Sequence, residues 1–146
     1  MTIDIPVKIL KHGKIFPKPT YQTDGSSGID LYAAIKRNIS LSRLARQGIP
    51  TGLCFEIPSG YEGHIRPRSG IFLNYGLMPL FGTIDSDFRG EVKILLINLS
   101  EKTFEITPGM RIGQIIFNKY EKVNLIESKS LKMTIRGDKG FGSTGK

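Results

Sequence analysis

The sequence is poor in the residues that build covalent or metal frameworks: it has one cysteine, Cys54, two histidines and no tryptophan. A single cysteine excludes an intrachain disulfide framework, and one Cys with two His cannot form a Cys/His zinc cage. No apolar run approaches the ~20 residues that span a bilayer. Residues 1–10 also lack the basic, apolar and small-residue order of a signal peptide. These absences predict a soluble, cytoplasmic protein of one domain.

Basic residues exceed acidic ones, with 21 Lys and Arg against 13 Asp and Glu in 146 residues, a formal net charge of +8. Such a surface attracts anions such as nucleic acid, anionic lipid or phosphorylated metabolites. The basic residues are scattered from Lys8 to Lys146 with no block of five or six in a row. Scattered lysines are also typical of an ordinary solvated surface, so charge alone does not choose the partner.

Short apolar or β-branched runs, separated by Gly, Pro, Asn and Asp, cover most of the chain. This spacing predicts an all-β fold, a single-domain jelly-roll-like β-barrel. The expected strands are Val7–Leu10, Ile29–Ala34, Gly52–Ile57, Gly63–Arg66, Glu91–Leu99, Phe104–Thr107 and Arg111–Tyr120. One short helix is expected over Ser69–Tyr75, with Ser69 as its N-cap and Gly76 as the left-handed residue that ends it.

The composition shifts near residue 129, which divides a β core over about 1–128 from a glycine-rich tail over about 129–146. The segment Gly140–Gly145 matches G-x-G-x-x-G, and Gly140–Lys146 matches G-x-x-x-x-G-K. Both motifs bind phosphate where a strand precedes and a helix follows, and no helix follows here. Two interpretations of the tail stay open: a flexible solubilising extension, or a loop that wraps a polyphosphate.

A second candidate anion site is Arg66-Pro67-Arg68-Ser69-Gly70, where basic side chains, a hydroxyl and free helix N–H groups meet. The alternative is that Ser69 only caps the helix and Arg68 pairs with a carboxylate.

A third candidate is Gly82–Gly90, which we expect to form a hairpin with Asp85 and Asp87 at its tip. A carboxylate placed there can orient a water molecule or assist a metal. An ordinary acidic turn is the competing interpretation, and Asp30, alone at the start of a strand, is equally ambiguous.

Taken in order, these segments resemble the homotrimeric deoxyuridine triphosphatase (dUTPase) family over about residues 5–146. The five family motifs correspond to Ser27–Ala33, Arg66–Gly70, Gly82–Glu91, Gly109–Gln114 and Arg136–Gly145.

The resemblance implies hydrolysis of dUTP to dUMP and pyrophosphate, which limits uracil in DNA and supplies dUMP for thymidylate synthesis. It assigns to Asp85 the activation of the water that attacks the α-phosphorus. Arg68, Ser69 and Gly70 are implied to hold the α- and β-phosphates, and Gln114 adds a donor. Mg²⁺ is the implied metal, held mainly by phosphates and waters and reached by Asp30 through a water.

The resemblance also implies active sites shared between the subunits of a homotrimer. Gly82, Thr83, Ile84 and Phe88 belong to the implied substrate-binding set of one subunit. In the tail of a neighbouring subunit, Arg136, Ser143 and Thr144 are implied to close over the γ-phosphate, next to Gly142, while Phe141 stacks on the uracil. The tail is then a lid that orders when nucleotide binds.

Two positions depart from the family pattern. Phe88 stands where the family usually has Tyr, and it keeps the ring that packs beneath the deoxyribose. Pro79 falls where an Asn commonly helps hold the uracil edge, and proline offers neither a side-chain amide nor a backbone N–H. Uracil selection is therefore expected to depend on backbone groups between Phe81 and Gly90.

The sequence fits three other functions less well. A dCTP deaminase, a near relative in fold, usually carries Arg-Ser-Ser where this chain has Arg68-Ser69-Gly70, and a Glu in place of the hairpin arrangement. A nucleic-acid-binding β-barrel would need exposed aromatics interleaved with basic residues, and the tyrosines form no such cluster; we expect no stable nucleic-acid partner and no membrane partner. An inactive jelly-roll module is disfavoured because every implied catalytic position carries a competent residue.

Overall fold

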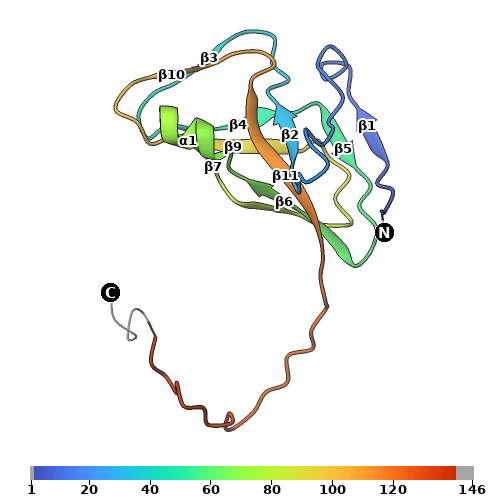
Figure 1. The fold of residues 1–146 in the computed structure, drawn as a ribbon, viewed down its shortest axis with the longest axis vertical. Helices are drawn as coiled ribbons and strands as arrows, with labels where there is room; N and C mark the ends of the chain where they lie inside the picture. Colours follow the sequence, from blue (N-terminus) through green and yellow to red (C-terminus); the bar gives the residue numbers. More distant parts are fainter. Residues whose placement is uncertain (1, 141–146) are drawn as a thin grey trace.

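The computed structural model describes residues 2–140 and consists mostly of short strands with one helix (Figure 1). The strands are β1 (Val7–Ile9), β2 (Ile29–Tyr32), β3 (Ile39–Leu41), β4 (Arg46–Pro50), β5 (Leu53–Phe55), β6 (Tyr61–Arg66), β7 (Leu77–Pro79), β8 (Gly82–Ile84), β9 (Lys93–Asn98), β10 (Phe104–Ile106) and β11 (Arg111–Lys119). The helix α1 spans Ser69–Tyr75.

The strands form four sheets rather than one continuous ring. A four-stranded sheet has the order β2-β11-β6-β8, a three-stranded sheet has the order β4-β9-β7, and β1-β5 and β3-β10 are two-stranded. Every pairing is antiparallel. The all-β, jelly-roll-type prediction is confirmed, but the barrel does not close among residues 2–140.

The strands are built from alternating side chains. Along β9, Ile94, Leu96 and Asn98 point inward and are fully buried, while Lys93 and Leu95 face outward. This period of two lets one face of each sheet cover a shared core, which collects buried aliphatic side chains from most strands and Ile71 from α1.

One polar side chain, Asn98, lies inside this core at 0% exposure. Its amide nitrogen donates to the carbonyls of Leu41 and Lys102, both at 2.8 Å, and its Oδ1 accepts from the N–H and hydroxyl of Ser100. A buried amide with all its partners costs little and fixes the geometry of the loops it joins.

The predicted strand set is incomplete. Sequence patterning found the strands that became β1, β2, β5, β6, β9, β10 and β11, and its strand list lacks β3, β4, β7 and β8. The missed strands are short, and β4 contains Gly48 and Pro50, which normally argue against a strand interior.

The predicted hairpin at Gly82–Gly90 is wrong. β8 pairs with β6, whereas β9 pairs with β4 and β7, so the two strands that flank Asp85 lie in different sheets. The segment is a loop that crosses from the four-stranded to the three-stranded sheet, because its flanking strands find partners distant in sequence.

The helix begins one residue away from the predicted cap. Arg68 occupies the N-cap position with extended backbone angles and no side-chain cap bond, and Ser69 is the first helical residue. The predicted stop is confirmed: Gly76 adopts φ 64° and its N–H donates to the carbonyl of Phe72. The hydroxyl of Ser69 is therefore not used as a cap.

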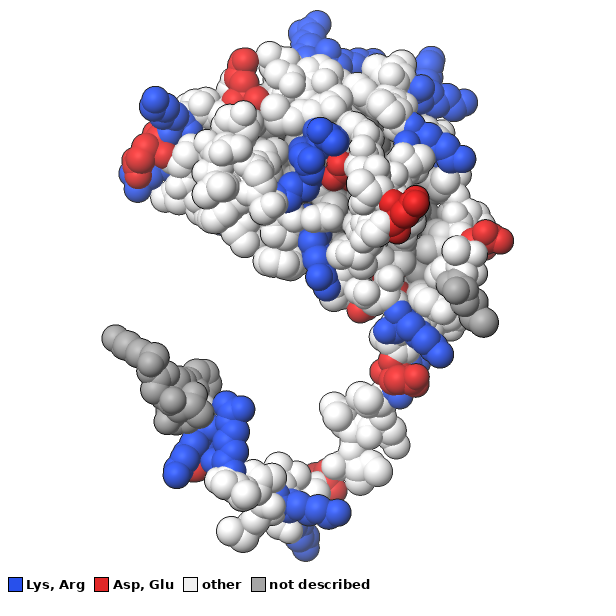
Figure 2. Space-filling view, viewed as in Figure 1, with Lys and Arg blue, Asp and Glu red and all other residues white. Residues whose placement is uncertain are grey.

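After β11 the chain leaves the core and runs away from it (Figure 1). Among residues 2–140, Tyr120 is the last with a hydrogen bond to the core, from its N–H to the carbonyl of Gly60 at 3.0 Å. Residues 121–139 are all exposed. Lys and Arg are spread over both core and tail on the face in view (Figure 2). Within residues 2–140, no helix has the length and apolarity needed to cross a membrane.

Candidate active site

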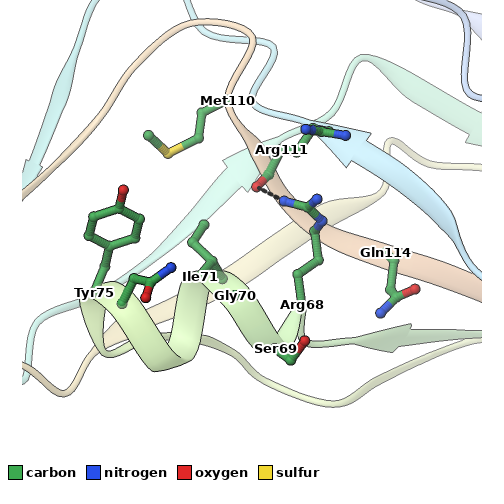
Figure 3. Close-up of a pocket in the computed structure, with 9 residues that line it drawn as sticks. Arg68, Ser69, Gly70, Ile71, Tyr75, Met110, Arg111 and Gln114 are labelled. Atoms are coloured by element: carbon green, nitrogen blue, oxygen red, sulfur yellow. Dashed lines mark hydrogen bonds between the residues drawn. The ribbon is translucent and has the colours of Figure 1, made fainter. Parts of the chain in front are cut away.

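A pocket of about 370 Å³ lies at the start of α1, where the helix faces the first half of β11 (Figure 3). Its walls combine guanidinium, hydroxyl and amide groups. They are formed by Arg68, Ser69, Gly70, Ile71, Asn74, Tyr75, Met110, Arg111 and Gln114. The pocket unites the second and fourth sequence motifs, which are far apart in the chain.

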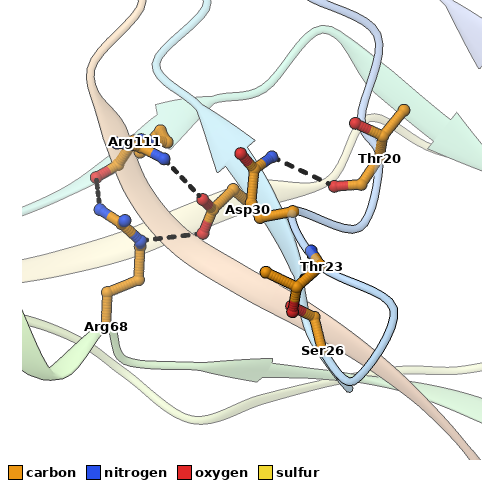
Figure 4. A network of polar contacts seen from close by, with 7 residues as sticks. Thr20, Thr23, Ser26, Asp30, Arg68 and Arg111 are labelled. Atoms are coloured by element: carbon orange, nitrogen blue, oxygen red, sulfur yellow. Dashed lines mark hydrogen bonds and ion pairs between the residues drawn. The ribbon is translucent and has the colours of Figure 1, made fainter.

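A carboxylate organises the basic side of this pocket (Figure 4). Asp30 on β2 is nearly buried, and its Oδ1 accepts from Arg68 Nε at 2.8 Å while its Oδ2 accepts from Arg111 Nη1 at 3.2 Å. Arg68 Nη1 also donates to the Arg111 carbonyl at 3.4 Å. Two guanidinium groups and one carboxylate leave a formal charge of +1, which suits an anionic ligand.

The amide of Gln114 joins three parts of the site. Its Nε2 donates to the Pro67 carbonyl at 2.8 Å, in the turn between β6 and α1. Its Oε1 lies where a Cβ on Gly28 would stand, so a side chain at that position would displace the Gln114 amide. Gln114 therefore holds the first and second motifs against β11 and keeps a second N–H for a ligand.

Gly70 differs from Gly28, because a Cβ there would meet no atom of the described chain within 4 Å. Nothing in the fold of this chain accounts for glycine at that helical position. Gly70 lines the pocket (Figure 3), so its lack of a side chain leaves room for a ligand to approach the backbone.

The loop after β8 carries the other predicted group, Asp85, and it forms a tight turn. The Phe88 N–H donates to the Asp85 carbonyl at 3.1 Å. Arg89 Nη1 donates to the carbonyls of Ser86 at 2.6 Å and Phe88 at 3.1 Å. A Cβ on Gly90 would meet the Phe88 ring at 2.6 Å, so the ring lies over the glycine backbone. Asp85 is exposed at the end of this braced loop.

Within one chain, Asp85 does not meet the pocket. β8 runs antiparallel to β6, with Gly82 opposite Ile65 and its last residue, Ile84, opposite Gly63. Asp85 follows at the end of β6 remote from Arg68, roughly 15–20 Å away at ~3.3 Å per residue. Gly82, Thr83, Ile84, Asp85 and Phe88 therefore form a second group, apart from Asp30, Arg68, Ser69, Gly70 and Gln114.

The tail residues stand apart from both groups. Arg136 is exposed, and its Nε donates to the Lys139 carbonyl at 2.9 Å. Phe141, Gly142, Ser143 and Thr144 lie outside the described residues.

Sequence reasoning missed Arg111, Asn74 and Tyr75, which also line the pocket. Arg111 lies within the fourth motif, but alternation along β11 would have placed it on the buried face, with Gly113 and Ile115. A register shift between Arg111 and Gly113 in the pairing with β2 breaks this alternation. Asn74 and Tyr75 stand four residues after Gly70 and Ile71, so the spacing in the predicted helix would have placed them on the same helix face.

The donor set limits how a metal could bind. Among residues 2–140, no group of three or more His, Cys, Asp or Glu side chains could hold an ion. Both oxygens of Asp30 already accept from arginines. One carboxylate beside an anion pocket fits Mg²⁺ bound chiefly by substrate phosphates and waters, and it does not fit a closed protein cage.

Comparisons with known proteins agree on one family. The dUTPase family model matches residues 14–145. The chain is 44% identical to the deoxyuridine 5'-triphosphate nucleotidohydrolase of Fusobacterium nucleatum, covering 97% of this chain and 98% of that protein. It is 47% identical to the protein of the same name from Wolbachia pipientis, covering 99% and 97%.

Solved structures show the same fold. The dUTPase of Staphylococcus bacteriophage 80alpha with dUpNHpp matches with a TM-score of 0.90 at 24% identity, covering 99% of both chains. A mutant dUTPase from phage phi11 of S. aureus, in which a structural Mg(II) ion is coordinated, matches with a TM-score of 0.80 at 18% identity, covering 90% of this chain and 100% of that one. On the family model and the similarity to the curated relatives, this chain belongs to the dUTPase family.

Proposed function

We propose that this chain hydrolyses dUTP to dUMP and pyrophosphate, in the cytoplasm where DNA precursors are made. The observation that carries the proposal is the polar pocket at the start of α1, where a carboxylate holds two guanidinium groups in place. Its chemistry suits a polyphosphate, and the chain belongs to a family whose curated members are named for this activity.

In this proposal the pocket holds the α- and β-phosphates. Arg68 has its Nε on Asp30, which leaves other guanidinium N–H groups for phosphate oxygens. The Ser69 hydroxyl is not used as a cap, and Gly70 lets phosphate approach the backbone. Gln114 supplies its second amide N–H.

Asp85 is the proposed general base. Its carboxylate accepts a proton from water, the water oxygen forms a bond to the α-phosphorus, and the bond from that phosphorus to the bridging oxygen breaks. Pyrophosphate leaves with the electron pair of that bond. The turn braced by Arg89 fixes the loop that carries Asp85.

Asp85 and the phosphate pocket lie at opposite ends of β6, so one chain cannot complete the site. We infer a homotrimer in which one subunit offers the phosphate pocket, a second offers Asp85 and Phe88, and a tail closes over both. The tail supports association, because Val123, Leu125 and Ile126 are 78%, 91% and 82% exposed along a chain that leaves the core. Burial of such exposed apolar side chains against a neighbouring subunit would stabilise the assembly.

The nucleoside is proposed to lie along β8, one of the two edge strands of its sheet. An edge strand has backbone N–H and C=O groups without a strand partner, and these can pair with the uracil edge. Pro79 is buried within β7 opposite Leu96 and has no backbone N–H or side-chain amide, so it offers the base no donor. Phe88, 42% exposed over Gly90, offers its ring to the deoxyribose.

Mg²⁺ is the proposed cofactor, with Asp30 reaching it through a water. When bound with the triphosphate, it offsets phosphate charge and fixes the conformation of the chain of phosphates. In the lid, Arg136, Ser143 and Thr144 are proposed to contact the γ-phosphate, and Phe141 to stack on the base.

The test is pyrophosphate release from dUTP, dTTP, dCTP and UTP, with and without Mg²⁺. We expect release from dUTP that depends on Mg²⁺ and exceeds release from the other three nucleotides. Ammonia release from dCTP would instead indicate a deaminase. Salt-resistant retention on heparin without nucleotide turnover would indicate a nucleic-acid-binding module.

Subunit mixing tests the shared site. Asp85→Asn chains mixed with chains truncated after residue 135 should regain activity, because a mixed trimer contains one intact site. Activity no higher than the sum of the two separate proteins, despite demonstrated subunit exchange, would contradict sharing.

A further inference from the structure

The loop that carries Asp85 ends at a carboxylate that joins two other segments of the chain. Glu91 follows Asp85 by six residues, and its Oε1 accepts from the backbone N–H of Gly52 at 2.7 Å. The same oxygen accepts from Nε2 of His12 at 2.7 Å. The Glu91 side chain is only 18% exposed, and hydrogen bonds to a partly buried charge contribute more than exposed ones. Glu91 thus ties residues 85–91, named here the Asp85 loop, to the core.

The close approach of two glycines brings His12 to this carboxylate. Gly52 lies between β4 and β5 with φ 72°, and a Cβ on it would overlap the Cα of Gly13. The N–H of Leu10 donates to the Gly52 carbonyl at 2.8 Å. The turn over residues 10–13 is therefore held against Gly52 through backbone atoms. From this turn the His12 imidazole reaches Glu91.

Backbone bonds continue the attachment one residue beyond Glu91. Val92 is 1% exposed, its N–H donates to the Leu53 carbonyl at 2.8 Å, and its own carbonyl accepts from the Thr51 hydroxyl at 2.6 Å. The Asp85 loop begins directly after β8, which pairs with β6. The loop is therefore fixed at both ends while Asp85 lies exposed between them, so the position of the Asp85 carboxylate depends on these attachments.

Glu91 has competing partners close by. It lines a pocket of about 690 Å³ together with His12 and three exposed lysines, Lys11, Lys36 and Lys93. Within residues 2–140 none of these lysines forms an ion pair. A carboxylate that lost its bond to His12 would be drawn toward the ammonium groups and away from the Gly52 N–H. The imidazole therefore keeps the carboxylate on the backbone.

We propose that His12 and Glu91 are positioning residues for the reaction, because together they hold the end of the loop that carries Asp85. The inference rests on the proposed role of Asp85 as general base. Neither side chain lines the phosphate pocket, and the pocket around Glu91 shares no residue with it. Loss of the pair should therefore lower kcat and leave KM for dUTP nearly unchanged.

Two substitutions of His12 test the pair. His12→Ala removes the donor and should lower kcat about tenfold, with KM within about twofold of the native value. His12→Gln carries an amide nitrogen in place of Nε2 and should recover most of that loss. Lys11→Gln, on the rim of the same pocket, is the matched control and should keep kcat within about twofold. Denaturant midpoints establish that each variant is folded under the assay conditions. A native kcat in His12→Ala, or an equal loss in both His12 variants, would overturn the proposal.

An Asp85→Asn background separates positioning from general damage to the fold. If His12 acts through the placement of Asp85, then His12→Ala should cause no further loss of kcat once that carboxylate has been replaced. A merely structural pair would lower kcat by the same factor in both backgrounds. That result would overturn the positioning role.

Hydrogen exchange measures the loop independently of activity. Backbone amides of residues 85–92 should exchange faster in His12→Ala than in the native protein, and at the native rate in Lys11→Gln. If the native protein hydrolyses dUTP while His12→Ala has native kcat and native exchange, the positioning role is wrong and the proposed function stands. If the native protein releases no pyrophosphate, the proposed function is wrong, and exchange alone decides whether His12 and Glu91 hold the loop.

Discussion

Asp30 and Arg68 form an ion pair with Oδ1 and Nε 2.8 Å apart, although one lies on β2 and the other at the start of α1. Arg111 completes the cluster at 3.2 Å from Oδ2. The bond through Nε fixes the plane of the Arg68 guanidinium while leaving other N–H groups for a ligand. The proposed chemistry depends most on this preorganisation, because Arg68 is the arginine proposed to bind phosphate.

Replacing that carboxylate should therefore affect both binding and folding. In Asp30→Asn, two arginines lose their countercharge in a partly buried cluster, and we expect the free energy of unfolding to fall by about 1–2 kcal/mol. KM for dUTP should rise, because Arg68 is no longer held in position. Urea denaturation and steady-state kinetics measure the two effects.

The matched control is Glu101→Gln, which breaks the exposed pair of Glu101 with Arg43 at 3.1 Å. Exposed pairs contribute little, so neither stability nor KM should change. An Asp30→Asn protein that behaves like this control would contradict the positioning role.

Gly70 offers a test that separates ligand binding from folding. In Gly70→Ala the new methyl group meets no atom of the described chain, and Ala favours a helix by about 0.5–1 kcal/mol over Gly. We expect unchanged or slightly higher stability together with weaker nucleotide binding, measured by calorimetry with dUpNHpp and Mg²⁺. Unchanged affinity in the stable variant would mean that phosphate does not approach the backbone at this position.

Asp85→Asn tests the proposed general base. The substituted side chain keeps its size and cannot accept a proton, so turnover should fall by about 10²–10⁴-fold while dUpNHpp binding and the proposed trimer persist. Asp87→Asn, two residues further along the same exposed loop, is the matched control and should retain most activity. Turnover of the Asp85 variant within threefold of the native enzyme would remove this residue from the role.

Local signals in the sequence were enough to predict some elements. Gly76 ended the helix as expected, since a left-handed residue there favours glycine, and β11 was recognised from its long apolar run. The loop around Asp85 was misjudged because adjacency along the chain suggested a hairpin, whereas β8 and β9 each pair with strands far away in sequence.

The same limit applies to the site. Asp30, Arg68 and Gln114 were found as motif members, but the cluster that Asp30 forms with Arg111 joins residues 81 positions apart. Only the pairing of β2 with β11 brings them together. The separation of Asp85 from the pocket likewise depends on the direction of β8 along β6, which no local pattern encodes.

Leu44 provides a test of stability away from the site. It has φ 58° in the turn between β3 and β4, a left-handed conformation that costs a side-chain-bearing residue about 1–2 kcal/mol, and it is 59% exposed. Its backbone N–H donates to the Asn98 carbonyl at 2.7 Å, which holds the turn in this conformation and does not depend on the side chain.

Leu44→Gly should relieve the strain, and after the entropy cost of glycine we expect a gain of about 0.5–1 kcal/mol in the free energy of unfolding. Leu44→Ala removes the same exposed apolar surface but keeps a Cβ, so it should leave stability nearly unchanged. Denaturant midpoints of the native protein and the two variants measure these changes. An equal gain in stability in both variants would mean that the exposed leucine side chain, and not the backbone conformation, is the cause.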